Sequence, residues 1–110
     1  MTDCLFCKIA SKDIPTDIKY EDEHIIAFPD INPKADVHLL VIPKLHIINL
    51  MDINDENQHI ITHLIRKLPV IAEKNGLSGF RTIFNSGKDG GQEVFHLHAH
   101  LLAGNIKFGG

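Results

Sequence analysis

The strongest constraint on the fold of this chain is the segment His-Leu-His-Ala-His at residues 96–100, where histidines alternate with apolar residues. Alternation is the period of a β-strand, so the three imidazoles should lie on one face and the apolar side chains on the other. Imidazole changes its charge near neutral pH, which suits it to nucleophilic attack, proton transfer and metal binding. The segment therefore predicts a catalytic strand, which we place at residues 94–102.

The rest of the chain combines short strand patterns with two helix patterns. Helical spacing of apolar residues predicts a short helix over residues 3–11 and a long one over residues 54–75. Pro69 lies inside the long helix, where a proline should kink the helix or divide it in two. Further strands are expected at residues 18–21, 24–28, 37–42 and 80–84. This order predicts a single α+β domain over residues 1–110, with a mainly antiparallel five-stranded sheet, one long helix and a short N-terminal helix.

The composition limits the function classes. The 110 residues are 44% hydrophobic and 23% charged, as in an ordinary globular domain. A net charge of −3 argues against polynucleotide binding, which needs a basic stripe. The first residues lack the positive flank and apolar core of a signal peptide, and no apolar segment is long enough to span a membrane. We therefore expect a cytoplasmic protein with no nucleic-acid or membrane partner, whose two cysteines are reduced or metal-bound.

A glycine-rich loop directly precedes the histidine segment. It contains Gly87, Gly90 and Gly91, whose backbone N–H groups could approach an anion closely. Asn85 and Gln92 add amide donors. Such a loop on its own is usually only a turn. Joined to alternating histidines, it indicates a phosphate held by loop amides and attacked by an imidazole.

Three alternating histidines followed by two apolar residues, at 96–102, also form a recognisable signature. Further motifs accompany it at residues 14–15 (Ile-Pro), 20–22 (Tyr-Glu-Asp), 27–28 (Ala-Phe), 30–33 (Asp-Ile-Asn-Pro), 38 (His), 41–44 (Val-Ile-Pro-Lys) and 90–92 (Gly-Gly-Gln). Over nearly its whole length the chain resembles the Hint-like branch of the histidine triad (HIT) family. The resemblance implies a HIT-like fold and a homodimeric purine nucleoside phosphoramidase. Such a hydrolase cleaves the P–N bond of substrates such as AMP joined to an amine, with no catalytic cofactor.

The resemblance implies a role for each histidine of the site. His98 would attack the α-phosphorus and form a covalent nucleotidyl-histidine, which water then hydrolyses. His100 would stabilise negative charge on the phosphate. His38 would orient the ring of His98 or relay a proton. His96 would hydrogen-bond within the triad or serve a metal site.

The resemblance also implies substrate contacts. Asn85, Gly91 and Gln92 would contact the phosphate or the leaving group, and Asp30 would accept hydrogen bonds from the ribose. Four apolar residues would enclose the purine base: Phe6, Ile9, Phe28 and Ile31. Without the resemblance, the two aromatic residues among them would be read as ordinary core.

The chain departs from the family pattern at Glu93, where eukaryotic relatives have a serine. A neutral carboxylic acid at this position could protonate the leaving group, whereas a carboxylate would repel the phosphate. The general acid is therefore open among His100, His38 and Glu93. The tail at residues 103–110 lacks the aromatic or basic residues that shape substrate choice in relatives, so the preferred leaving group stays open too.

The cysteines form a second motif, Cys-x-x-Cys, near the start of the chain. Two thiolates with this spacing can bind one tetrahedral zinc ion together with two histidines. The resemblance to zinc-binding bacterial relatives assigns the ligands as Cys4, Cys7, His46 and His96. Zinc bound there would be structural. The alternative is a pair of reduced, partly buried thiols without a metal.

The remaining histidines have simpler interpretations. His59 and His63 lie one turn apart on the predicted long helix and could form a metal pair, although a solvated helix face is the simpler reading. His24 lies among acidic residues and is interpreted as a surface residue of a turn.

Three functions follow as hypotheses. The first is a hydrolase that forms a nucleotidyl-histidine. The second is a zinc hydrolase in which the histidines of residues 96–100 hold a catalytic metal, and the third is a nucleotide-binding module with little turnover. Against the second, the outer histidines of a straight strand would lie roughly 13 Å apart, too far to share one ion.

Overall fold

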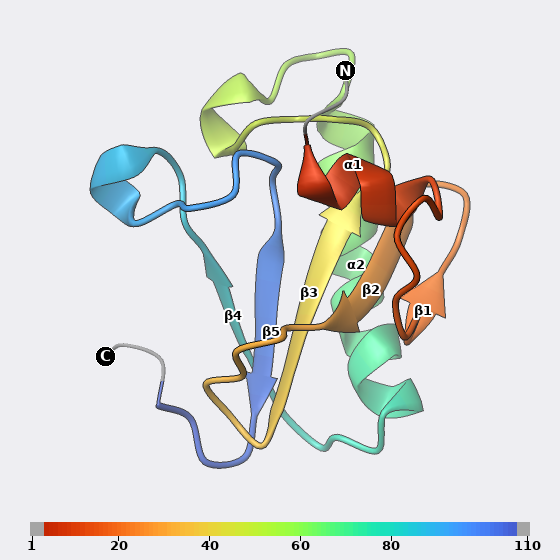
Figure 1. The fold of residues 1–110 in the computed structure, drawn as a ribbon, viewed down its shortest axis with the longest axis vertical. Helices are drawn as coiled ribbons and strands as arrows, with labels where there is room; N and C mark the ends of the chain where they lie inside the picture. Colours follow the sequence, from red (N-terminus) through yellow and green to blue (C-terminus); the bar gives the residue numbers. More distant parts are fainter. Residues whose placement is uncertain (1–3, 108–110) are drawn as a thin grey trace.

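The computed structural model describes residues 4–107, which form one sheet flanked by two helices (Figure 1). The helices are α1 (Leu5–Ala10) and α2 (Gln58–Lys74). The strands are β1 (Tyr20–Glu21), β2 (Ile25–Pro29), β3 (Val37–Pro43), β4 (Arg81–Phe84) and β5 (Ala99–Ala103). Two short 3₁₀ helices, η1 (Leu50–Asp52) and η2 (Lys88–Gly90), lie in the loops. Residue 3 of the expected N-terminal helix and residues 108–110 of the tail lie outside the described residues.

The five strands form one antiparallel sheet in the order β1-β2-β3-β5-β4. This arrangement confirms the predicted α+β fold with a five-stranded sheet, one long helix and one short helix. β3 lies at the centre and is paired with β2 on one side and β5 on the other. The register places Leu102 opposite His38 and His100 opposite Leu40. Because paired residues point to the same face, His38 and His100 share one face of the sheet.

The two helices cover opposite faces of the sheet (Figure 1). α2 buries Leu64, Leu68 and Ile71 against one face, and α1 buries Phe6 and Ile9 against the other. The face covered by α1 is the one that carries His38 and His100, because the even-numbered residues of β3 pack there. α1 covers only part of this face. Within the described residues, neither helix is long and apolar enough to cross a lipid bilayer.

α2 is shorter than predicted and is not divided by its proline. Residues 54–57 form a turn instead of the first turn of the helix, because the Asn54 side chain accepts hydrogen bonds from the N–H groups of Glu56 and Asn57. The helix then continues through Pro69 to Lys74. Pro69 and Ile65, whose carbonyl loses its helical partner, are both exposed, so the break in hydrogen bonding faces water. Of the two outcomes predicted for Pro69, a kink or a division, the division into two helices is wrong.

The histidine strand is also shorter than predicted. β5 begins at Ala99, so only the last histidine of the segment lies within a strand. Continuing the register of β3 and β5 would place Leu97 opposite Pro43, which has no N–H to donate. The N–H of Leu97 instead donates to the carbonyl of Ile47 at 2.6 Å. The predicted strand over residues 94–102 is therefore wrong in its first five residues, and His96 and His98 precede β5 although both rings pack against Phe6.

Candidate active site and a neighbouring cysteine cluster

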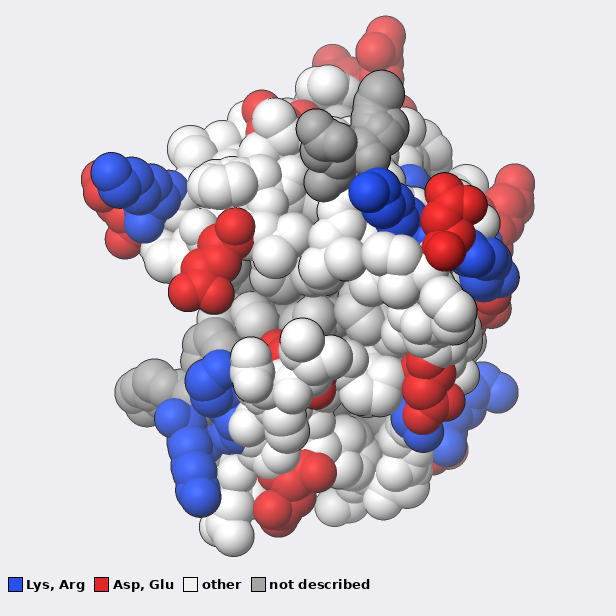
Figure 2. All heavy atoms as spheres, in the orientation of Figure 1, with Lys and Arg blue, Asp and Glu red and all other residues white. Residues whose placement is uncertain are grey.

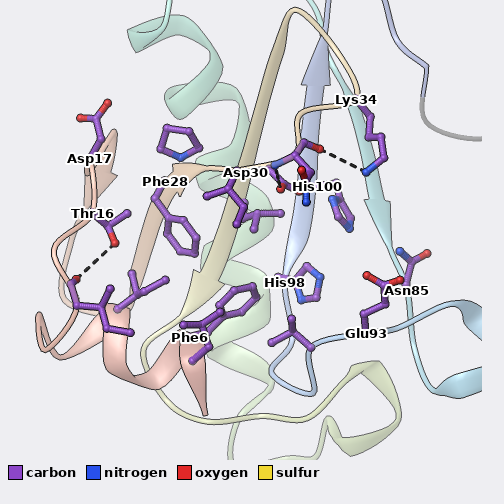
Figure 3. A pocket seen from close by; sticks show the side chains of 18 of the residues that line it. Phe6, Thr16, Asp17, Phe28, Asp30, Lys34, Asn85, Glu93, His98 and His100 are labelled. Atoms are coloured by element: carbon purple, nitrogen blue, oxygen red, sulfur yellow. Dashed lines mark hydrogen bonds between the residues drawn. The ribbon is translucent and has the colours of Figure 1, made fainter. Parts of the chain in front are cut away.

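A cavity of about 920 Å³ opens on the sheet face beside α1. Figure 3 shows His98 between an aromatic side with Phe6 and a polar side with Asn85 and Glu93. On the face of the molecule in Figure 2, charged side chains lie mainly around the margins and the centre is largely uncharged. Ten of the predicted site residues line this cavity: Phe6, Ile9, Phe28, Asp30, Ile31, Asn85, Gly91, Glu93, His98 and His100. The sequence segments that supply them are far apart along the chain.

The ring of His98 is held by the backbone that precedes it. Its Nδ1 lies 2.7 Å from the carbonyl oxygen of His96, and a carbonyl can only accept, so Nδ1 carries the proton. The lone pair of neutral His98 therefore lies on Nε2. Burial lowers the pKa of His98 below its usual range, which keeps the ring neutral at pH 7. This corrects the expectation that His38 orients His98, because the His96 carbonyl does so.

His38 belongs to a different chain of hydrogen bonds. The backbone N–H of Lys34 donates to His38 Nδ1 at 2.9 Å, so neutral His38 carries its proton on Nε2. That Nε2 lies 2.9 Å from His100 Nδ1 and 3.4 Å from a carboxylate oxygen of Asp30. His100 Nδ1 accordingly accepts, and neutral His100 carries its proton on Nε2. One backbone amide thus sets the tautomers of two histidines in sequence.

Burial also sets the charge of these rings. It lowers the pKa of His100 to about 4, and the nearby rings of His98 and His38 add to the shift. Burial lowers the pKa of His38 as well, although the Asp30 carboxylate opposes the change. At neutral pH these imidazoles are therefore neutral and have fixed tautomers. Nε2 of His98 has the lone pair of a nucleophile, and Nε2 of His100 has a proton to donate.

The aromatic side of the cavity is built from both α1 and β2. Phe6 packs edge to face on Phe28, with ring centroids 5.5 Å apart, and on His98 at 5.1 Å. Both phenylalanines are almost fully buried, and Ile31 on the next loop is 92% exposed. Phe6 and Phe28 thus serve the core and the cavity wall at once. Ile31 lines the cavity with its side chain open to solvent.

Gln92 lies outside the cavity lining, which does not support its predicted contact with phosphate. Its buried side chain makes four hydrogen bonds within the loops. The amide group donates to the carbonyls of Ile48 and Val94, and the side-chain oxygen accepts from Gly87 N–H and Asn49 Nδ2. Gln92 therefore holds the glycine-rich loop in place. Asn85 and Gly91 of the same loop do reach the cavity.

The sequence did not indicate two basic residues of the cavity wall, Lys34 and Lys107. Lys107 N–H donates to the Lys34 carbonyl at 2.6 Å, which joins the C-terminal segment to the loop after β2. The one available signal was the position of Lys34, four residues before His38 and after a proline. Spacing of this kind does not identify a backbone amide as the group that fixes a histidine tautomer.

His96 joins the two cysteines instead of the cavity. Its Nδ1 lies 3.2 Å from Cys4 Sγ, 3.5 Å from Cys7 Sγ and 3.2 Å from His46 Nδ1. Cys7 Sγ lies 3.3 Å from His46 Nδ1, and all four donor atoms lie within 4.8 Å of one another. His96 Nε2 donates to the Pro43 carbonyl at 2.8 Å, which directs the Nδ1 lone pair at the thiols.

The dimensions of this cysteine cluster fit a tetrahedral zinc ion. Zinc bonds of about 2.3 Å to sulfur and about 2.0–2.1 Å to nitrogen require donor separations of roughly 3.3–3.8 Å. Burial and the neighbouring Cys4 thiol raise the pKa of Cys7 to about 11, so the Cys7 thiol by itself stays protonated at neutral pH. A divalent cation reverses that preference, because thiolates are its ligands. Cys4 Sγ also accepts from the Cys7 N–H at 3.3 Å, which helps to start α1.

The last three histidines also meet in space. His24, in the turn between β1 and β2, contacts the rings of His59 and His63 on α2, with centroids 5.9 and 5.3 Å away. His63 Nε2 hydrogen-bonds to Asp22 at 2.7 Å. His24 and His63 are half-buried, so the expectation of isolated surface residues is incomplete.

Comparison with known proteins agrees with this geometry. The family model for the scavenger mRNA decapping enzyme C-terminal binding domain matches residues 3–110. Protein HitA of Neisseria gonorrhoeae is 50% identical over 103 residues, which cover 93% of this chain and 96% of that protein. A purine nucleoside phosphoramidase of Escherichia coli K12 is 41% identical over 102 residues, which cover 91% and 86%. The crystal structure of a HIT family hydrolase from Legionella pneumophila has a TM-score of 0.88 and 46% identity, with 93% of each chain covered.

Proposed function

Because this chain belongs to the histidine triad family and is a HIT family hydrolase, we propose that it hydrolyses purine nucleoside 5′-phosphoramidates, of the type AMP joined to an amine. The similarity to a purine nucleoside phosphoramidase at 41% identity supports this substrate class. The observation that carries the proposal is the pair of opposite tautomers at the cavity: His98 has its lone pair on Nε2, and His100 has its proton there.

The proposed reaction has two halves. His98 Nε2 attacks the α-phosphorus, the P–N bond breaks, and the amine leaves with a proton from His100 Nε2. His38 keeps its own proton and, by donating to His100 Nδ1, stabilises the negative charge that the ring of His100 carries until a proton returns. Water then attacks the nucleotidyl-histidine, His98 leaves the phosphorus, and the proton of water returns to His100. Across both halves, the P–N bond and one water molecule are converted into one P–OH bond and one N–H bond.

The shape of the cavity supports a purine nucleotide as ligand. Phe6, Phe28 and Ile31 offer an apolar space for a flat base, and Asp30 between them and the histidines is placed to accept from the ribose hydroxyls. Asn85 lies on the polar side of His98, where we propose that the phosphate binds. Gly91 also lines the cavity, but its N–H donates to the Lys88 carbonyl at 3.0 Å, so we propose no phosphate contact for that N–H. We propose no contact for the Gln92 side chain.

We also propose that Cys4, Cys7, His46 and His96 hold a structural zinc ion. The donor distances and the direction of the His96 lone pair support it. The ion would supply no chemistry to the reaction. It would tie α1, the segment after β3 and the segment before β5 together.

A homodimer is the proposed assembly. β4 is an edge strand of the sheet, so one side of its backbone has no strand partner among residues 4–107. Ile83 and Phe84 on this strand are only half-buried, and Phe80 just before it is exposed. A second copy would cover this edge. Light scattering should give the mass of two chains, and a monomer at micromolar concentration would contradict the proposal.

The geometry does not support a zinc hydrolase based on the 96–100 histidines. Among residues 4–107, the groups whose possible ligand atoms already lie within 4.8 Å of one another are the cysteine cluster and a set of Asp30, His38 and His100, and neither includes His98. The triad histidines are thus distributed over different groups and do not converge on one ion.

The test of the proposed function is His98→Gly with adenosine 5′-phosphoramidate as substrate. We expect wild-type protein to release ammonia and to show a transient mass increase of one adenylyl group, and the variant to do neither while still binding AMP. Turnover by the variant at the wild-type rate would refute the role of His98. Wild-type protein that binds AMP without turnover would favour a nucleotide-binding module.

A further inference from the structure

The chain contains eight histidines, and they lie in three separate groups. His98 and His100 line the cavity and His38 hydrogen-bonds to His100, whereas His46 and His96 belong to the cysteine cluster. The proposed function gives no role to the third group, His24, His59 and His63, although the fold brings all three together. We call this third group the His24 cluster.

The His24 cluster joins two elements that are distant along the chain. His59 and His63 lie one turn apart in α2, so their side chains leave the same face of the helix. His24 lies in the turn before β2 and is packed edge to face against both, with centroid separations of 5.9 and 5.3 Å. Its side chain is 35% exposed and that of His63 29% exposed, while His59 is exposed. Solvent therefore reaches the cluster.

A carboxylate holds one of the three rings in a fixed orientation. Asp22 accepts from His63 Nε2 at 2.7 Å and from the Tyr20 hydroxyl at 2.9 Å. Its other oxygen accepts from the N–H groups of His24 and Ile25 at 2.8 and 3.1 Å. Because Nε2 of His63 carries the proton, its lone pair lies on Nδ1. His96 in the cysteine cluster has the same arrangement, with Nε2 donating to an oxygen and Nδ1 available as a ligand.

We propose that His24, His59 and His63 form a second metal site, which binds one Zn²⁺ or a similar divalent transition-metal ion at the surface. Imidazole is a preferred ligand of these ions. A carboxylate that accepts from the second ring nitrogen is the usual support of a metal-binding histidine. Water completes the coordination on the exposed side.

The ligands of the His24 cluster are less preorganised for a metal ion than those of the cysteine cluster. At the cysteine cluster the donor atoms already lie within 4.8 Å of one another. Here the rings are in edge-to-face contact, and a metal requires the exposed ring of His59 and the partly exposed ring of His24 to rotate. Since this rotation costs side-chain entropy and the site has no thiolate, zinc binds here more weakly than at the cysteine cluster.

The test is a calorimetric titration of Zn²⁺ into full-length protein that already carries one equivalent of zinc. We expect one further equivalent to bind, and His59→Gln and His24→Gln each to abolish this event. In ¹⁵N–¹H spectra of the imidazoles, the second equivalent should shift His24, His59 and His63. Shifts at His38 and His100 instead would place the ion in the cavity and overturn the proposal. Absence of a second event in wild-type protein would overturn it too.

A matched pair of variants separates the hydrogen bond of Asp22 from its charge. Asp22→Asn and Glu23→Gln each remove one negative charge beside the cluster, but Glu23 is 3.9 Å from His24 and its side chain is 88% exposed. We expect Asp22→Asn to weaken the second zinc affinity by about 10- to 100-fold, and Glu23→Gln to change it by less than about threefold. Equal effects of the two variants would mean that only charge attracts the ion, with no built site.

Discussion

The backbone N–H of Lys34 determines where the protons of the cavity lie. It fixes His38 in one tautomer, and His38 in turn fixes His100. The donor is the backbone N–H of Lys34 and not its side chain, so the residue type does not reveal this effect. The protonation pattern is a property of the loop that precedes β3.

Replacing His38 with asparagine should separate catalysis from binding. The variant loses the Nε2–H that faces His100 Nδ1, so His100 no longer has a fixed proton on Nε2. We expect kcat to fall about 100-fold while the affinity for AMP stays near the wild-type value, because His38 does not line the cavity. Single-turnover kinetics and AMP titration measure the two quantities. His59→Asn, on α2 at the opposite face of the sheet, is the control, and an equal loss in both variants would contradict this role of His38.

The pH profile of kcat/KM should have an unusually acidic lower limb. Burial lowers the pKa of His100 to about 4, with His98 and His38 adding to the shift. Protonation would remove the lone pair on Nδ1 that accepts from His38, so activity is present above the pKa of His100 and is lost as the pH falls through it. Burial also lowers the pKa of the nucleophile His98, which must be neutral to attack, so we expect the acidic limb of kcat/KM to lie below the ordinary imidazole pKa of about 6.5. A limb near pH 6.5 would contradict the burial argument.

Gln92 should matter for stability more than for binding. Gln92→Met keeps the length of the side chain but leaves the N–H of Gly87, the amide of Asn49 and two loop carbonyls without their partners. We expect the free energy of unfolding to fall by about 3 kcal/mol, as measured by urea denaturation. The KM of active protein at low temperature should change little. A large rise in KM with unchanged stability would restore the predicted phosphate contact.

Spacing alone singled out His98 and His100 and the glycine-rich loop, and the resemblance to the HIT family added other residues of the cavity lining, such as Asp30 and Phe6. They could not show which hydrogen bonds each side chain makes. Gln92 and Asn85 are both amides in the same loop, yet only Asn85 reaches the cavity. The difference depends on how the loop folds over Asn49, which is far away in sequence.

Among the elements, α2 shows how an unfavourable residue is accommodated. Pro69 removes one hydrogen bond from the helix, but at an exposed position where water can satisfy the Ile65 carbonyl. Pro69→Ala should restore the bond and raise the free energy of unfolding by about 1–2 kcal/mol, after allowing for the greater freedom of the unfolded chain. Urea denaturation measures it, with Arg66→Ala as an exposed control that should change stability by less than about 0.5 kcal/mol. An unchanged or lower stability would mean that the helix depends on the proline.

Most of the helices and strands were predictable, because the spacing of apolar residues and the prolines and glycines that end an element are local signals. The failure at β5 has a different cause. Alternation at residues 94–98 is a correct local pattern, but the partner strand ends in Pro43, which cannot continue the ladder. Pairing partners are decided by the whole sheet. Local periodicity therefore gave the right kind of element and the wrong beginning.

At the scale of the whole molecule, the cysteine cluster joins segments from both ends of the chain. Chelation of the proposed zinc should therefore lower Tm by about 10 °C or more and make the segment of α1 sensitive to protease. Differential scanning calorimetry with and without chelator measures the first effect, and limited proteolysis the second. Cys4→Ser should behave like the chelated protein, and an unchanged Tm in both cases would contradict a structural metal. The chelator should not stop the reaction of His98 in protein that remains folded.

The contact of Phe6 with His98 has a consequence for biosynthesis. A ribosome releases α1 well before the segment that carries the nucleophile, so a growing chain exposes Phe6 and two thiols until residues 96–100 emerge. The aromatic wall, the oriented nucleophile and the cysteine cluster can be completed only when residues 96–100 emerge. A nascent chain of this protein should therefore be unable to consume nucleotide, and its N-terminal cysteines should be the part that most needs protection from oxidation before folding is complete.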